Sequence, residues 1–117
     1  MINPEITPQS EDRNIITEIF VWNGITIAVG YEPLWLAFRG EPPGEFDMAH
    51  IEVRVVEPRS APIPITETGY LSHFTGIGVV EEAGGPIAFV KAALDEKANS
   101  KSWRAAQAKW QQQDLFA

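Results

Sequence analysis

Two runs of apolar, mostly β-branched residues lie near the start of the chain and are joined by Asn23-Gly24, within the stretch 15–31. A type I′ turn needs positive φ at both central residues, and Asn-Gly meets that need at the lowest steric cost. Isoleucine, valine, phenylalanine, tryptophan and threonine dominate both runs, as they do in half-buried strands. The pattern predicts a β-hairpin over residues 15–31.

Residues 49–57 alternate between apolar and polar side chains, which predicts a strand with one wet face. The apolar positions are Ile51, Val53 and Val55, and the polar positions are His50, Glu52 and Arg54. The run 34–38 is apolar at every position, so periodicity alone does not separate a buried strand from a helix there. Residues 40–47 contain Pro-Pro and two glycines and are predicted to form a loop.

The middle of the chain has weaker patterns. Three prolines in 58–64 withhold hydrogen-bond donors, which predicts an extended crossing segment instead of a central strand. Residues 65–74 have mixed polarity and Gly69 at an expected turn, so a loop is predicted. A short strand with a bulge is predicted over 75–80, followed by a turn over 81–85.

Helical periodicity begins at Pro86, a residue that suits the first position of a helix because its missing N–H costs nothing there. Apolar residues then recur at helical spacing and predict a helix over 86–98; they are Ile87, Val90, Leu94 and Ala98. Ser100 or Ser102 can cap a second helix, which places Trp103, Ala106 and Trp110 on one face.

These elements predict one α+β domain over 14–111, in which three or four antiparallel strands precede a helical pair that covers one sheet face. Residues 1–13 are polar, have no periodicity and are expected to form a flexible arm. Residues 112–117 are expected to form a C-terminal tail. We see no internal repeat.

The charge is acidic and uneven, with a formal net charge of −7. Residues 1–90 hold thirteen acidic and four basic side chains, a net −9, whereas residues 91–117 hold three acidic and five basic ones, a net +2. Binding to phosphate backbones depends on Lys and Arg, so direct nucleic-acid binding is not expected. The chain lacks cysteine, any signal-peptide pattern and any apolar run that could span a bilayer, so a cytoplasmic location without membrane contact is expected.

Catalytic chemistry has little support in the sequence. His50 and His73 are the only histidines, and no His-x-x-x-His spacing accompanies Glu52 or Glu67. No nucleophile elbow, dinucleotide fingerprint or phosphate-binding lysine motif is present, so we expect neither an enzyme nor a cofactor or metal.

Polar and aromatic residues crowd the predicted 65–74 loop, and Thr66, Glu67, Tyr70 and His73 are the candidates for a binding site there. The alternative is that these side chains only anchor the loop and bond to its backbone.

The last residues include Gln112-Gln113-Asp114-Leu115-Phe116. This pentapeptide resembles the short motif with which many bacterial proteins dock on the β sliding clamp of the replicative polymerase. The resemblance implies that Gln112 takes a polar site, Asp114 the third position, and Leu115 and Phe116 an apolar pocket. Gln113 departs from the commoner leucine, which should weaken binding.

Two buried apolar anchors contribute roughly 1.5–3 kcal/mol each, whereas ordering a free peptide costs roughly 2–5 kcal/mol, so a micromolar affinity is expected. The alternative is that the tail folds back and Phe116 fills the core of its own domain.

The segment Pro-Ile-Thr-Glu-Thr-Gly-Tyr-Leu-Ser-His-Phe, the Glu-Ala-Gly-Gly-Pro before a helix, and the terminal Asp-Leu-Phe together carry a second resemblance. They are similar to a family of small proteins of unknown activity from bacterial plasmids and other mobile elements, over about residues 49–117. That family implies no activity. The terminal motif makes a protein-interaction domain that docks on the β sliding clamp through its C-terminal tail the leading hypothesis. An acidic decoy that imitates DNA, and a ligand-binding module that uses the 65–74 loop, are the alternatives, and the oligomeric state stays open.

Overall fold

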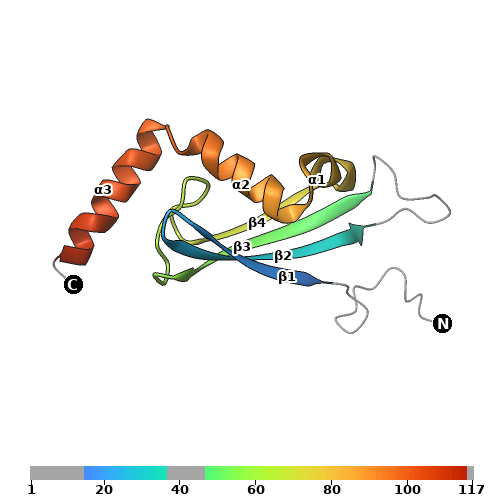
Figure 1. Ribbon diagram of the computed structural model, residues 1–117, viewed down its shortest axis with the longest axis horizontal. Helices are drawn as coiled ribbons and strands as arrows, with labels where there is room; N and C mark the ends of the chain where they lie inside the picture. Colours follow the sequence, from blue (N-terminus) through green and yellow to red (C-terminus); the bar gives the residue numbers. More distant parts are fainter. Residues whose placement is uncertain (1–14, 37–46, 116–117) are drawn as a thin grey trace.

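The computed structural model describes residues 15–36 and 47–115, which form an antiparallel sheet followed by helices (Figure 1). The strands are β1 (Ile16–Trp22), β2 (Ile25–Leu36), β3 (Met48–Glu57) and β4 (Tyr70–Gly76), and the helices are α1 (Ile77–Ala83), α2 (Pro86–Lys97) and α3 (Lys101–Leu115). The strands lie in sequence order β1-β2-β3-β4. The predicted α+β class is confirmed, with four strands in the sheet and three helices in place of a pair. The expected N-terminal arm and most of the 40–47 loop lie outside the described residues.

The predicted hairpin is confirmed. Asn23 and Gly24 have φ values of 48° and 77°, as a type I′ turn requires. Trp22 pairs with Ile25 beside the turn, and the register continues without a break to Ile16 opposite Tyr31. β2 extends to Leu36, so part of the apolar run 34–38 belongs to a strand.

β3 has the two faces that its alternation predicts. Ile51, Val53 and Val55 are buried, and the first two are only 1% exposed. They face Tyr31, Val29 and Ile27 across the β2 register, respectively. A register shift between Thr26 and Ile27 leaves Val56 without a directly opposed partner. The core therefore lies on one face of the sheet.

The predicted loop over residues 65–74 is wrong in its second half. Its second half is β4, which pairs with β3 along its whole length. Gly69 precedes the strand with a φ of +82° and accepts a hydrogen bond at its carbonyl from the Val55 N–H at 2.8 Å. β4 is an edge strand with side chains exposed on both faces, and this mixed polarity imitates a loop.

The predicted strand over residues 75–80 is confirmed only at Thr75 and Gly76, which end β4, and is wrong from Ile77 on, because Ile77–Ala83 form helix α1. Ile77 and Val80, three residues apart, are buried under this helix. Gly84 ends it in the left-handed conformation, and its N–H donates to the Glu81 carbonyl at 3.0 Å. The predicted turn over 81–85 is therefore shorter than expected.

The two predicted helices are confirmed. α2 begins at Pro86 and buries Val90 and Leu94. The Trp103 N–H donates to the Ser100 hydroxyl at 3.1 Å, which makes Ser100 the residue that caps α3. Trp103 is 6% exposed, and its ring meets Trp22 edge to face at 6.1 Å. The indole N–H of Trp22 donates to Asp95 at 3.0 Å, so one tryptophan of the hairpin contacts both α2 and α3.

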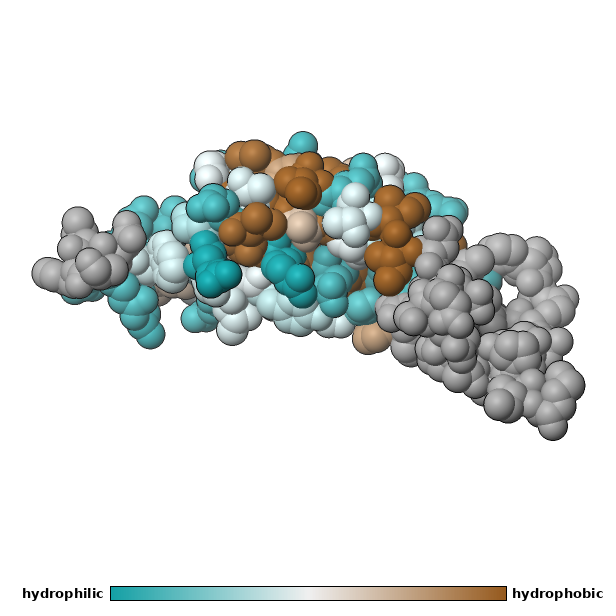
Figure 2. All heavy atoms as spheres, turned by 90° about the horizontal axis from the view of Figure 1, so that it is seen from below, coloured by the Kyte–Doolittle hydropathy of each residue, from teal (hydrophilic) through white to brown (hydrophobic). Residues whose placement is uncertain are grey.

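Helices α1 and α2 lie on one side of the sheet, and α3 runs from the end of α2 past the hairpin end of the strands (Figure 1). The opposite side, here called the open face, remains uncovered by these helices and shows apolar side chains among polar ones (Figure 2). No helix in the described parts of the chain is long and apolar enough to cross a membrane.

Candidate functional site

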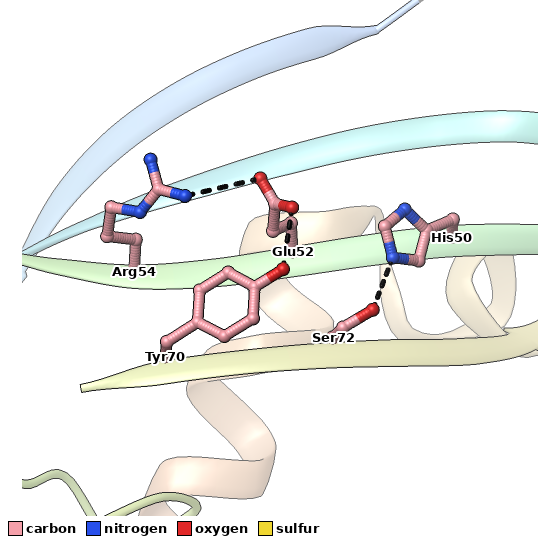
Figure 3. Close-up of polar contacts among 5 residues, drawn as sticks. All are labelled: His50, Glu52, Arg54, Tyr70 and Ser72. Carbon is pink, nitrogen blue, oxygen red and sulfur yellow. Dashed lines mark hydrogen bonds and ion pairs between the residues drawn. The ribbon is translucent and has the colours of Figure 1, made fainter. Parts of the chain in front are cut away.

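The open face carries a row of polar and aromatic side chains on β3 and β4, which we call the aromatic ladder. The antiparallel register places His50 opposite Phe74, Glu52 opposite Ser72 and Arg54 opposite Tyr70. Residues opposite one another, or one step along the diagonal, come within side-chain reach in such a sheet. Five of the six side chains are drawn in Figure 3.

Three side chains at one end of the ladder hold one another in place (Figure 3). The Tyr70 hydroxyl donates to Glu52 Oε2 at 2.8 Å. Arg54 Nη2 lies 3.8 Å from Glu52 Oε1, and the guanidinium carbon of Arg54 lies 5.5 Å from the centre of the Tyr70 ring. Glu52 thus accepts from a phenol and pairs with a cation, while the exposed tyrosine ring is fixed between them.

The other end of the ladder is an aromatic stack. The His50 ring lies over the Phe74 ring with 4.6 Å between centroids and 29° between planes. His50 Nε2 and the Ser72 hydroxyl share a hydrogen bond of 2.6 Å, and the histidine tautomer decides which of them donates (Figure 3). Phe74 is still 46% exposed, so a preordered aromatic surface faces outward.

Tyr70 is a hydrogen-bond donor in this site. Its bond to Glu52 raises the pKa of the Tyr70 hydroxyl above its usual 10.0, and burial adds to the effect. A phenol with a raised pKa keeps its proton at neutral pH and cannot act as a base there. Tyr70 can therefore donate a hydrogen bond and stack, and its phenol is not a nucleophile at neutral pH.

Exposed apolar side chains outside the ladder lie on β1, just before β1 and near the end of β3. Ile19 and Val21 are 64% and 63% exposed, and Ile15 and Val56 are also exposed. We call these four residues the apolar strip. They contribute to the apolar surface seen among polar groups in Figure 2, and β1 is the outermost strand on this side.

The four residues predicted to share a loop site do not come together. Thr66 and Glu67 lie in the turn before β4, whereas Tyr70 and His73 lie on β4 and face opposite sides of the sheet. The Thr66 hydroxyl donates to the Tyr70 carbonyl at 2.9 Å. His73 lies on the helix-covered side, where its ring is 6.0 Å from that of Phe89. Only Tyr70 belongs to the ladder.

Sequence reasoning found half of the ladder. The alternation over 49–57 placed His50, Glu52 and Arg54 on one wet face. Ser72 and Phe74 were missed as members of the same surface because their segment was taken for a loop. The available signal was the alternation of Tyr70, Ser72 and Phe74 with Leu71, His73 and Thr75.

Two hollows lie beside residues 65–74, the segment that was predicted to be a loop. One of about 310 Å³ is lined in part by Thr66, Glu67 and Trp103, and one of about 170 Å³ lies between the sheet and α2 beside His73 and Phe89. Sites for small molecules usually measure about 300–1,000 Å³. The first hollow is at the lower limit of that range, and the second, apolar hollow is below it.

The C-terminal candidates lie at the end of α3. Gln112 is exposed, and the helix includes Asp114 and Leu115, whereas Phe116 lies outside the described residues. The helix continues past Trp110, so the expected tail begins as regular structure up to Leu115. The alternative in which Phe116 fills the core concerns a residue that is not described.

Metal chemistry has no candidate centre in the described ranges 15–36 and 47–115, where no group of three histidine, aspartate or glutamate side chains could hold an ion. His50 and Glu52 point from the same face of β3, yet each bonds to a different partner on β4. These two bonds hold both side chains in place on the open face.

Comparison with known proteins gives one family. No curated protein and no solved structure matches the chain. A family model described as the KlcB third domain matches residues 15–103, and KlcB is a plasmid-borne protein. The match runs from the start of the hairpin to Trp103, and it covers the aromatic ladder but not residues 112–117. The chain therefore belongs to the KlcB third-domain family.

Proposed function

We propose that this chain is a protein-interaction domain that binds a partner protein with the open face of its sheet. The observation that carries the proposal is the aromatic ladder, in which exposed Tyr70 and Phe74 are fixed by hydrogen bonds and stacking on rigid strands. Tyrosine, phenylalanine and arginine are enriched in protein interfaces, and prior ordering reduces the entropic cost of association.

The charge of the ladder favours a protein partner over a nucleic acid. Arg54 is the only lysine or arginine on the described part of the open face, and it already faces Glu52 and Tyr70. A surface for single-stranded nucleic acid combines aromatic rings with a positively charged groove. The rings are present here, and the described strands of the open face carry no basic side chain besides Arg54.

An acidic decoy has less support from the geometry. Imitation of a phosphate array needs acidic side chains on one face. The described acids are spread over β1, β3, α1 and α2, for example as Glu18, Glu52, Glu81 and Asp95. Glu52 on the open face is paired with Arg54, so this face does not present a row of free negative charges.

The test is site-specific photocrosslinking in plasmid-bearing bacteria, with a benzoyl-phenylalanine in place of Phe74. Its control carries the same group in place of Val79, an apolar residue of α1 that is 52% exposed. We expect a discrete covalent protein adduct at position 74, its loss with an added Tyr70→Ala change, and no such adduct at position 79. Equal adducts at both positions, or none at position 74, would contradict the proposal.

A second candidate function is docking on the β sliding clamp through residues 112–117. The observation that favours it is the position of Gln112 and Gln113, both exposed on a helix that leaves the sheet (Figure 1). The purified chain and a Leu115→Ala/Phe116→Ala variant would be compared for binding to the host clamp. Micromolar binding by the wild type alone supports this function, and absence of binding by both removes it.

A further inference from the structure

We infer that two copies of this chain pair through their β1 strands, in antiparallel register about a two-fold axis at Ile19, to form one continuous eight-stranded sheet. The strand is at the edge of the sheet, and in the described residues nothing pairs with its outer side. This pairing concerns the β1 edge and does not depend on partner binding by the aromatic ladder.

The outward hydrogen-bonding groups of β1 follow from the hairpin. With a two-residue turn, Trp22 and Ile25 form a hydrogen-bonded pair. Along β1 and β2, such pairs alternate with pairs that are not hydrogen-bonded to each other. The N–H and C=O groups of Thr17, Ile19 and Val21 consequently face away from β2. Natural edge strands are usually protected by lysine, proline or a bulge. β1 has none of these three, since it reads Ile-Thr-Glu-Ile-Phe-Val-Trp and its register is regular, and its one charged residue is Glu18.

The other edge of the sheet is less available. Along β4 the Tyr70 carbonyl accepts from the Thr66 hydroxyl at 2.9 Å and from the Thr68 hydroxyl at 3.2 Å. The Tyr70 N–H donates to Thr68 Oγ1 at 3.4 Å. These side chains occupy the first position at which a foreign strand could add to β4. Among the described residues, β1 is therefore the edge more available for pairing.

The charge of Glu18 favours a second copy of the chain as the partner of β1, and it also favours one register of pairing. With the axis at Ile19, the charged residue Glu18 lies opposite Phe20 of the second copy. The Lys91 ammonium lies 5.8 Å from the centre of the Phe20 ring in each chain, so each Glu18 approaches a lysine of the other copy. Moving the axis to Glu18 would instead place two glutamates directly opposite, which is unfavourable.

The same register buries the most exposed apolar residues of the edge. Ile19 lies opposite Ile19 of the second copy, and Thr17 lies opposite Val21 on the same open face. On the helix-covered side, Ile16, which is 46% exposed, lies opposite Trp22. Two open faces then form one surface, with an aromatic ladder toward each end.

Cysteine crosslinking tests the register, because the natural chain contains no cysteine. Opposed residues in a hydrogen-bonded antiparallel pair are separated by about 5.5 Å between Cα atoms, within the range of about 4.4–6.8 Å that a disulfide spans. Under mild oxidation, Ile19→Cys should form a covalent dimer with itself. Thr17→Cys and Val21→Cys should each form no covalent dimer alone and should crosslink when mixed. Self-crosslinking of Thr17→Cys, or no preference for the mixture, would overturn this register.

Sedimentation of the full chain tests the association itself. We expect a concentration-dependent dimer for the wild type at micromolar concentration, a shift of at least tenfold toward monomer for Ile19→Asp, and no shift for Val79→Asp. Both changed residues are more than half exposed, so neither should unfold the chain, and circular dichroism checks this. A monomeric wild type, or a dimer that Ile19→Asp does not weaken, would overturn the proposal.

Discussion

At the scale of single residues, Gly69 fixes the way in which the chain enters β4. Its φ is +82°, and a Cβ built there would lie 2.9 Å from the Ser60 Cα. Its carbonyl also accepts from Val55. Glycine is therefore needed at this position both for its backbone conformation and for the close approach of the preceding turn.

Gly69→Ala should destabilise the protein more than Gly24→Ala. Gly24 has a similar φ of +77° but nothing within 4 Å of a built Cβ. Both changes incur a left-handed backbone cost of about 1–2 kcal/mol, and the clash should add roughly 1–3 kcal/mol at Gly69. Urea unfolding of the two variants measures the difference. Equal losses would mean that the turn at Ser60 moves aside freely.

The environment of Tyr31 should make the free energy of unfolding depend on pH in the alkaline range. Burial raises the pKa of its hydroxyl above 10.0, and the negative charge of Glu81 adds to the shift. A group whose pKa is raised by folding stabilises the protein fully below its unfolded pKa, and that contribution is lost as the pH rises through the folded value. The free energy of unfolding should therefore fall above about pH 10.

In Tyr31→Phe this part of the fall should be absent, because phenylalanine does not titrate. Urea unfolding from neutral pH to above pH 10 measures it for both proteins. Tyr70→Phe is the control, since Tyr70 is 42% exposed and its pKa shift is screened by solvent. Parallel curves for wild type and Tyr31→Phe would exclude Tyr31 as a source of the alkaline loss.

At the scale of elements, the sequence predicted what local chemistry dictates and missed what tertiary packing decides. Asn23-Gly24 and Pro86 impose their backbone conformations wherever they occur, and both elements were found. α1 contains Gly78, which disfavours a helix, and it forms because Ile77 and Val80 are buried by other parts of the fold. β4 was missed because an edge strand with exposed aromatic residues lacks a clean apolar face. Half of the ladder was lost with it.

Trp103 attaches α3 to the rest of the fold, so its removal should strongly lower the free energy of unfolding. Trp103 is 6% exposed against Trp22, whereas Trp110 is only partly buried. Trp103→Ala should lower the free energy of unfolding by about 3–5 kcal/mol and increase amide exchange throughout α3. Trp110→Ala should cost clearly less. If both variants lost the same stability, the contact between Trp22 and Trp103 would not be what anchors the helix.

At the scale of the whole molecule, the net charge opposes pairing of two copies, whereas the apolar β1 edge favours it. The chain has a formal net charge of −7, so two copies repel each other at long range, although the β1 edge is apolar and Glu18 has Lys91 of the other copy nearby. Exposed charges are screened beyond a Debye length of about 10 Å at 0.1 M salt. Short contacts at the strand junction are less affected than the repulsion between the acidic bodies.

Dimer formation should consequently strengthen as salt is added. Sedimentation in about 0.02 M and about 0.5 M sodium chloride, which span the relevant screening lengths, should show a lower dissociation constant at high salt. Glu18→Gln should leave the direction of this trend unchanged, because the repulsion comes from the net charge of the whole chain. A dissociation constant that rises with salt would mean that ion pairs such as Glu18 with Lys91 dominate the association. The apolar strip would then have a smaller part than its exposure suggests.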